Sequence, residues 1–330
     1  MIVWMSCLLP MAAGAASPPA LDAAPADARA WLARIHAAAN LRNYQGTMVF
    51  TTGGMLSSSR VAHFRVGDQS FERQEALDGR LQRIYRHNDV VLTLWSQSRL
   101  AIIDSRNVST QIGSLTRAAE PRAVEQYALK PEGTERVAGR EALVLLLQPR
   151  DELRYAQRVW ADRGTGLMLR TDVIGPGKAV LESAAFSEIE IGVRPQPDSV
   201  LQPMHKLDGY RVLRPLQVVT QLEAEGWLMA RDVSGFVLAG CLKRPLDATA
   251  GADGQPVANQ VLQAVFSDGL THVSMFIEPF APGRHKLGLH AQIGATATMT
   301  QRRGDFWITT MGDVPVATLQ LFTEALERRP

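Results

Sequence analysis

The chain has 330 residues, a length that suits two domains and allows each to bury a core. Hydrophobic residues make up 46%, which is ordinary for a globular protein. The formal net charge is +2 and aromatic residues make up only 6%, so neither a strong positive field nor a basic stripe interleaved with aromatics argues for nucleic-acid binding.

Residues 1–20 predict a signal peptide. They carry no charge and pass from an apolar run into small residues, as a secretory leader does. The apolar run is about 16 residues, shorter than the ~20 that a bilayer-spanning helix needs. No Lys or Arg precedes the run, so we expect the true translation start to lie upstream of Met1. The expectation is export from the cytoplasm.

An amphipathic pattern predicts a helix over residues 28–39, with Asp27 as its cap. Its apolar face requires something to pack on, and the sheet that follows is the simplest partner. Strands are predicted at 47–51 and 59–66, separated by Gly53-Gly54. The residues of the apolar helix face are Trp31, Leu32, Ile35, Ala38 and Ala39.

The stretch 70–104 predicts an antiparallel meander. Asp78-Gly79 between two strand-like runs is a strong hairpin signal, because Gly tolerates the positive φ of a tight turn. The first two strands carry charges and keep a wet face. The third, 90–95, is apolar on both faces, and a fourth follows at 100–103. A strand of that kind needs cover on both sides, from a helix layer or a ligand.

Further strand patterns follow up to residue 191, with 130–133 and 175–178 interpreted as turns and 108–120 as a surface loop. The sum is roughly ten strands with one N-terminal helix, and a sheet of that size must curl or close. We therefore predict an N-terminal domain over 26–192. Its fold is a large curved antiparallel sheet with helical cover on the concave side.

Repeated prolines predict a linker over 193–223, and a small α+β domain is expected over 224–330. Strands are expected around 227–231, 236–243, 261–266, 271–277, 287–293, 295–301 and 306–311, with a loop at 250–254. In the closing helix Asp313 is the expected cap and Pro315 falls in the first turn. Val316, Leu319, Phe322 and Leu326 form its apolar stripe.

The sequence contains none of the common catalytic and metal-binding motifs G-x-S-x-G, H-E-x-x-H, C-x-x-C and the P-loop. His285 and His290 lie on opposite faces of a predicted strand, so we expect no metal site there. Glu72, Glu75 and Asp78 are most simply a solvated face paired with Arg73, Arg80 or Arg83. Once the leader is removed, Cys241 is the one cysteine left, and we interpret it as a buried small hydrophobe. No cofactor and no catalysis are expected.

A curved sheet with an apolar inner face and a helical lid leaves room for a hydrophobic groove. Each inner-face residue alone is most simply core, and only their number and the thin cover argue for a pocket. A buried acyl chain of about 14 carbons would gain roughly 10 kcal/mol gross, at ~0.8 kcal/mol per methylene. The candidate groove residues are Met48, Phe50, Phe64, Leu92, Leu94 and Trp160.

Four segments in this order resemble the MucB/RseB family: 31–50, 71–91, 155–174 and 306–315. The most specific parts are Leu77-Asp78-Gly79, Trp160-Ala161-Asp162 and Thr165-Gly166-Leu167. The resemblance spans nearly all of the chain after the leader. Ser234 departs from it, standing where Pro is expected before Gly235-Phe236.

The resemblance implies a periplasmic protein whose large N-terminal domain is similar to the lipoprotein carriers LolA and LolB, an unclosed barrel with a hydrophobic groove. It implies binding to the periplasmic part of a membrane-spanning anti-sigma factor of the RseA or MucA type, through the C-terminal domain and linker. That binding would shield the partner from a regulatory protease and repress the envelope-stress response. Lipid from lipopolysaccharide or lipoprotein would loosen the complex.

Three functions stay open at this point. The first is the regulatory binding protein just described, with lipid in its groove. The second is a periplasmic carrier of lipid or lipoprotein without a signalling role, against which the second domain argues. The third is an enzyme with an unrecognised site. The sequence identifies neither the residues that contact a partner nor whether copies assemble into a homo-oligomer.

Overall fold

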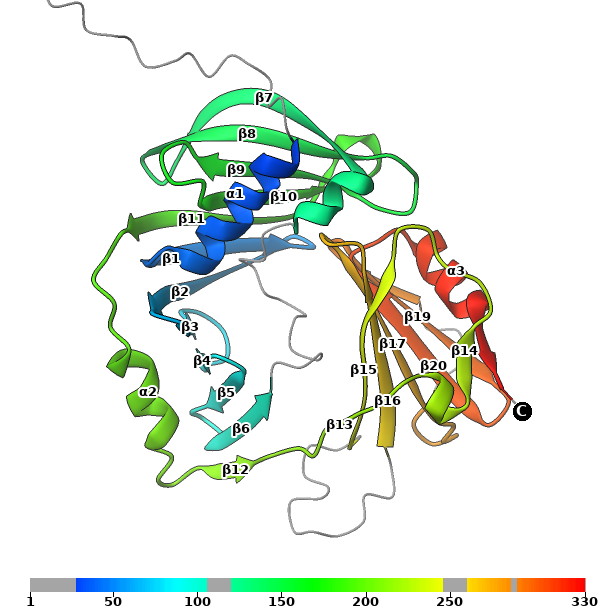
Figure 1. Ribbon diagram of the computed structural model, residues 1–330. Helices are drawn as coiled ribbons and strands as arrows, with labels where there is room; N and C mark the ends of the chain where they lie inside the picture. Colours follow the sequence, from blue (N-terminus) through cyan, green and yellow to red (C-terminus); the bar gives the residue numbers. More distant parts are fainter. Residues whose placement is uncertain (1–27, 106–119, 246–259, 286–289, 330) are drawn as a thin grey trace, which may run out of the picture.

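The structure, a computed structural model, describes residues 28–105, 120–245, 260–285 and 290–329 (Figure 1). The predicted signal peptide lies outside the described residues, as do nearly all of the loop expected at 108–120 and the whole loop expected at 250–254. Among the described residues, no helix is long and apolar enough to cross a membrane.

The larger sheet runs in the order β12-β6-β5-β4-β3-β2-β1-β11-β10-β9-β8-β7 within the described chain. Neighbours pair antiparallel except β12 and β6, which are parallel. The two edge strands, β7 and β12, do not pair, so the sheet stays unclosed, which confirms the predicted fold class. Its strands are β1 (Tyr44–Thr52), β2 (Met55–Val66), β3 (Gln69–Ala76), β4 (Gln82–His87), β5 (Val90–Trp95), β6 (Leu100–Ser105), β7 (Tyr127–Val137), β8 (Arg140–Pro149), β9 (Ala156–Asp162), β10 (Met168–Ile174), β11 (Val180–Ile191) and β12 (Arg211–Leu213).

The meander predicted from Asp78-Gly79 is confirmed, with a wider turn than expected. Residues 77–81 connect β3 to β4, and Gly79 takes φ +65°. Asp78 accepts hydrogen bonds of 2.7 Å from both the backbone N–H and the hydroxyl of Ser58. The acidic residues of this region pair across strands: Glu72 with Arg86 at 3.0 Å and Glu75 with Arg60 at 3.9 Å.

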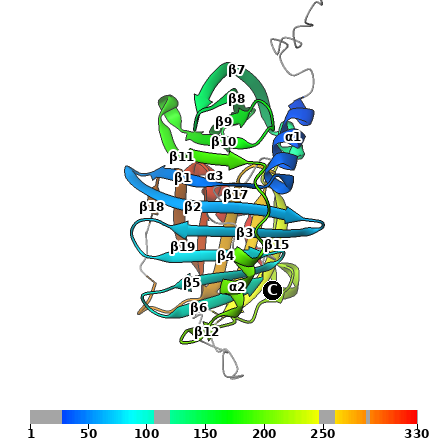
Figure 2. The ribbon, with the colours of Figure 1, turned by 90° about the vertical axis from the view of Figure 1, so that its left-hand side faces the viewer.

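Two helices cover opposite faces of this sheet. The predicted first helix, α1 (Ala28–Leu41), packs Leu32 and Ile35 over β8 and β9. Helix α2 (Asp198–His205) lies over β3 to β5, where its fully buried Val200 packs in the cluster that holds Leu92 and Leu94 (Figures 1 and 2). One face of β5 is thus covered by a helix, as the two-sided apolar pattern requires.

Two expectations for this half need correction. Residues 130–133 do not end a strand; they form a β-bulge between Pro131 and Gly133 inside the continuous β7. The segment 193–223, predicted as a linker, carries α2, β12 and β13, so it packs on both sheets. The predicted domain boundaries themselves stay predictions.

The C-terminal part forms a second sheet in the order β13-β15-β16-β17-β20-β19-β18, and a two-stranded β14-β21. Helix α3 (Val316–Ala325) covers one face of the second sheet. The expected Asp313 cap is wrong: Pro315 holds the cap position, and Asp313 accepts a hydrogen bond from Thr296 at 2.5 Å. The strands are β13 (Val218–Val219), β14 (Trp227–Met229), β15 (Val237–Pro245), β16 (Gln260–Ser267), β17 (His272–Pro279), β18 (His290–Ile293), β19 (Thr296–Arg303), β20 (Phe306–Gly312) and β21 (Leu326–Arg328).

Candidate ligand and partner sites

The six candidate groove residues are all buried, the most accessible being Phe50 at 6%. They lie in three separate clusters. Met48 and Phe50 pack near α1, the cluster beneath α2 holds Phe64, Leu92 and Leu94, and Trp160 packs with Val144 and Leu169. The structure therefore does not bring them into one groove.

Side chains alternate between the two faces along β2, and this alternation explains why Met48 and Phe64 are separated. Ser59 lies opposite Met48, and Val61 follows on the same face, whereas Phe64 points to the other face of the regular strand. The sequence pattern did not predict this separation, because α2, which covers that other face, falls in a segment interpreted as a linker.

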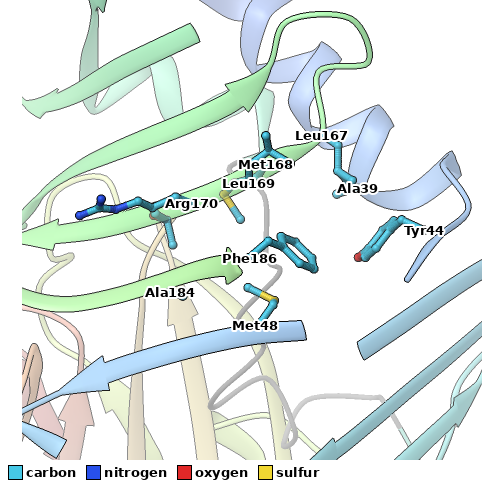
Figure 3. A pocket seen from close by; sticks show the side chains of 10 residues that line it. Ala39, Tyr44, Met48, Leu167, Met168, Leu169, Arg170, Ala184 and Phe186 are labelled. Atoms are coloured by element: carbon cyan, nitrogen blue, oxygen red, sulfur yellow. The ribbon is translucent and has the colours of Figure 1, made fainter. Parts of the chain in front are cut away.

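Beside α1, the pocket near Met48 is small (Figure 3). Its volume is about 10 Å³, room for about one water molecule. An acyl chain therefore needs α1 to move before it can enter here. The pocket is lined by Ala39, Tyr44, Met48, Leu167, Met168, Leu169, Arg170, Thr171, Ala184 and Phe186.

A fully buried ion pair joins the two halves of the molecule. Arg154, between β8 and β9, donates from Nε to Asp268 in the β16–β17 turn at 2.7 Å, and both side chains are 0% exposed. Tyr127 donates its hydroxyl to the same carboxylate at 3.0 Å. Arg154 also contacts Asp151, and it donates to the Ser234 carbonyl at 2.6 Å.

The surroundings favour the charged form of Arg154 and the neutral form of Tyr127. Burial disfavours the Arg154 cation, but hydrogen bonds to Asp151 and Asp268 outweigh burial and raise its pKa. Burial, together with the charge of Asp268, holds the pKa of Tyr127 well above its usual value, so the hydroxyl stays a donor. We call this set the Arg154 junction: Arg154, Asp268, Tyr127 and Asp151.

Further contacts seal the Arg154 junction. The N–H of Glu120 donates to the Gly269 carbonyl at 2.7 Å, and the Thr318 hydroxyl donates to the Leu153 carbonyl at 2.8 Å. Gly235 takes φ +77°, and a Cβ there would lie 2.4 Å from Arg154. No local sequence pattern predicts the junction, because Asp268 lies 114 residues from Arg154 and 141 residues from Tyr127.

A larger cavity lies between the two sheets, with a volume of about 470 Å³. Strands β5 and β6, the segment after β12 and the α3-distal face of the second sheet supply its walls. Its lining residues are Thr93, Trp95, Ile102, Asp104, Pro215, Gln217, Arg244, Pro245, Val261, Phe276, Glu278, Thr309 and Met311.

Arg244 is the notable cation of this cavity. Its buried Nε makes no hydrogen bond within the described part of the chain, and its guanidinium lies 5.5 Å from the centre of the Phe276 ring. Burial lowers its pKa, and the charge of Asp104 opposes that shift. Trp95 also lines the cavity, which therefore combines aromatic surface with a cation that has an unused donor among the described residues. Such a cavity suits a peptide segment with apolar and acidic side chains.

His285 and Cys241 take structural positions. His285 stacks on Trp307 with ring centres 4.8 Å apart, and its Nδ1 accepts from the Ala281 N–H at 3.0 Å. In the described ranges, no three His, Cys, Asp or Glu side chains gather as a metal site. Cys241 is 3% exposed, as expected, and burial raises the pKa of its thiol to about 11.

Both halves of the chain match domain models of one protein family. Residues 27–204 match the MucB/RseB N-terminal domain and residues 221–327 match the MucB/RseB C-terminal domain. The sigma factor AlgU regulatory protein MucB of Pseudomonas aeruginosa is 28% identical over 315 residues, 92% of either chain. The sigma-E factor regulatory protein RseB of Haemophilus influenzae is 23% identical over 295 residues, 87% of either chain.

Solved structures agree on the fold. A crystal structure of MucB in complex with MucA(peri) aligns with a TM-score of 0.65 at 25% identity, covering 92% of this chain and all of that chain (100%). A crystal structure of MucB aligns with a TM-score of 0.65 at 24% identity, covering 91% of this chain and 97% of that chain.

Proposed function

The chain belongs to the MucB/RseB family, and we propose that it is a periplasmic regulatory protein that binds the periplasmic part of a membrane-spanning anti-sigma factor. The observation that carries the proposal is the presence of both family domains in order, together with a relative crystallised with MucA(peri). Binding would protect the anti-sigma factor from regulated proteolysis and so repress the envelope-stress response.

The cavity between the sheets is the candidate partner site. It is lined by the C-terminal domain and by the segment after β12, where partner contacts are expected, and it is large enough for several side chains. Within the described ranges the buried Nε of Arg244 makes no hydrogen bond, and a partner carboxylate would supply one.

Isothermal titration of the mature chain with the periplasmic segment of its own organism's anti-sigma factor tests this function. We expect tight binding, and about tenfold weaker binding for Arg244→Met, a loss of about 1.4 kcal/mol. Arg231→Met is the matched control, because Arg231 is 55% exposed in its pair with Glu324. No binding by the wild type would refute the function. Unchanged binding by the Arg244 variant would refute the site alone.

We further propose that lipid binds beneath a helix of the N-terminal sheet and releases the partner. Uncovering Leu32 and Ile35 of α1 costs about 3–6 kcal/mol, against roughly 10 kcal/mol gross for burying a 14-carbon chain. A lipid could therefore displace the helix. Release of the partner requires that lipid bind the partner-free form more tightly.

A fluorescent fatty acid tests the lipid proposal. Leu32→Ala loosens α1 and Val200→Ala loosens α2, since both side chains are at most 2% exposed. If lipid enters beneath α1, Leu32→Ala should bind the probe more tightly than the wild type does. If lipid enters beneath α2, Val200→Ala should do so. In either case less helix packing is lost when the helix moves. Added lipid should also lower the affinity for the anti-sigma segment. A probe that binds none of the three proteins contradicts lipid sensing.

A carrier function is the second candidate, favoured by the large unclosed sheet under its helices. It predicts transfer of bound lipid to acceptor vesicles at a rate that the anti-sigma segment does not change. The second domain, which a carrier does not require, argues for regulation instead.

A further inference from the structure

Exposed apolar side chains gather at one end of the larger sheet, where the hairpins β1–β2 and β3–β4 turn. Each of these side chains is between 43% and 70% exposed. Single exposed apolar residues are common on proteins, but a gathered set marks an interaction surface. We call the set the hairpin rim: Met55, Leu56, Leu77, Leu81, Val180 and Ile293.

Backbone contacts hold the rim together across segments far apart in sequence. Thr52 pairs with Glu182, which places the start of β11 beside the β1–β2 turn. A Cβ on Gly53 would lie 3.4 Å from the Ile293 side chain. The Leu77 N–H donates to the Ser58 carbonyl at 3.0 Å. With strands about 4.8 Å apart, β4, β3, β2, β1 and β11 spread the rim over roughly 20 Å (Figure 2).

The β1–β2 hairpin has the composition of an interfacial tip. No charged residue occurs from Tyr44 to Ser59. A Cβ on Gly54 would meet nothing within 4 Å, so the chain borders open space at Gly54, whereas Gly53 lies against Gly294 and Ile293. Met55 and Leu56, directly after Gly54, are 64% and 70% exposed. Exposed apolar side chains with uncharged neighbours suit the interfacial layer of a bilayer.

Cations occur in the other turns at this end of the sheet. The turns 53–54, 77–81, 96–99 and 175–179 together hold Arg80, Arg99 and Lys178 against one carboxylate, Asp78, a net charge of +2 (three minus one). The three cations are exposed and make no ion pair among the described residues. This arrangement complements an anionic headgroup layer, which attracts cations next to inserted apolar groups.

We propose that the hairpin rim docks the protein onto the surface of a phospholipid bilayer that contains anionic lipid. A few apolar side chains and three cations give a weak, reversible attachment, like that of a single acyl anchor. A partner fixed in the same membrane would raise the effective concentration of the rim at that surface. The docking itself needs no partner, so it is tested separately from the proposed function.

Flotation of the mature full chain with large unilamellar vesicles provides the test. Vesicles of phosphatidylglycerol and phosphatidylethanolamine should carry the wild type upward. M55S/L56S should reduce the bound fraction at least about fivefold, because the inserting tip is lost. V218S/V219S is the matched control, since these residues are 56% and 67% exposed on β13, away from the rim. Both pairs are exposed, so thermal unfolding should stay unchanged.

A second arm isolates the charges. R80Q/R99Q/K178Q, or phosphatidylcholine vesicles in place of anionic ones, should weaken flotation while leaving the tip intact. Wild type that stays at the bottom of the gradient with anionic vesicles would overturn the proposal, as would full flotation of M55S/L56S. Light scattering after gel filtration measures the mass in solution and so tests the alternative that a second copy of the chain binds the rim. A drop in mass confined to M55S/L56S, without a change in flotation, would assign the rim to self-association and overturn bilayer docking.

Discussion

Asp162 closes the turn between β9 and β10 with a carboxylate that is 3% exposed. It accepts hydrogen bonds from Arg140 at 2.7 Å and from the N–H and hydroxyl of Thr165 at 2.8 and 2.7 Å. Burial opposes its charge, but these bonds outweigh burial and lower its pKa. We expect Asp162→Asn to lose about 2 kcal/mol of unfolding free energy at pH 7, measured by urea titration.

The pH dependence gives that prediction its sign. Because the pKa of Asp162 is lower in the fold than in the unfolded chain, the stabilisation is complete above the unfolded value of about 4 and fades as pH falls through the folded one. The gap between wild type and variant should therefore shrink in acid. Glu141→Gln, in an exposed pair with Arg163, should change stability by less than about 1 kcal/mol. A gap that persists unchanged at low pH would contradict the carboxylate's role.

At the residue scale, sequence predicted burial better than it predicted neighbours. Cys241, Phe64 and Trp160 are buried as their apolar contexts indicate. Partners were harder, because a side chain chooses them across strands: Trp160 donates to Glu135 at 2.9 Å and lies 4.3 Å under the Arg170 guanidinium. Neither contact has a signature in local spacing.

At the scale of elements, Gly46 carries the close approach of β1 to β11. A Cβ at this position would lie 2.2 Å from the carbonyl oxygen of Glu188, a backbone atom that cannot rotate away. Gly46→Ala should force the two strands apart beside the bulge after Thr47 and cost about 2 kcal/mol, read from the denaturation midpoint.

Gly164→Ala is the control for Gly46→Ala. Its φ is ordinary, and the nearest atom to a new Cβ, on Asp162, is 3.5 Å away, so it should stay within about 0.5 kcal/mol of wild type. Equal effects of the two substitutions would mean that glycine flexibility, rather than space, decides the result.

Long periodic elements were predictable and short ones were not. The helix at 28–39 and the strands of the meander match α1 and β3 to β6, because amphipathic spacing and Asp78-Gly79 are local signals. Strands β12 and β13 have three and two residues, too few to show any period, and they form only because a sheet edge is available. The prediction of a turn at 130–133 was wrong for the converse reason. Pro131 and Gly133 are residues typical of turns, yet the backbone pairing of β7 with β8 continues past them.

At the scale of the whole molecule, the Arg154 junction decides whether two sheets behave as one body. Each sheet has its own core cluster, so each half can hold its own structure. Removing one charge of a fully buried pair leaves the other uncompensated, at a cost of about 3–5 kcal/mol. We expect Asp268→Asn to split a single calorimetric unfolding transition into two and to raise the radius of gyration in solution scattering.

Restoring a matched apolar pair separates charge from packing at the same place. The double variant R154M/D268L removes both charges together, and replacements of this kind are often neutral or stabilising. If the ion pair only fills space, the double variant should recover one transition and the wild-type radius of gyration. If Arg154 orients the second half through the Ser234 carbonyl and the Phe236 ring, 4.6 Å from its guanidinium, stability should return while the radius of gyration stays high. We expect stability to return while the radius of gyration stays high, because methionine cannot replace those directed contacts. A double variant with the wild-type radius of gyration would show instead that packing alone sets the geometry between the sheets.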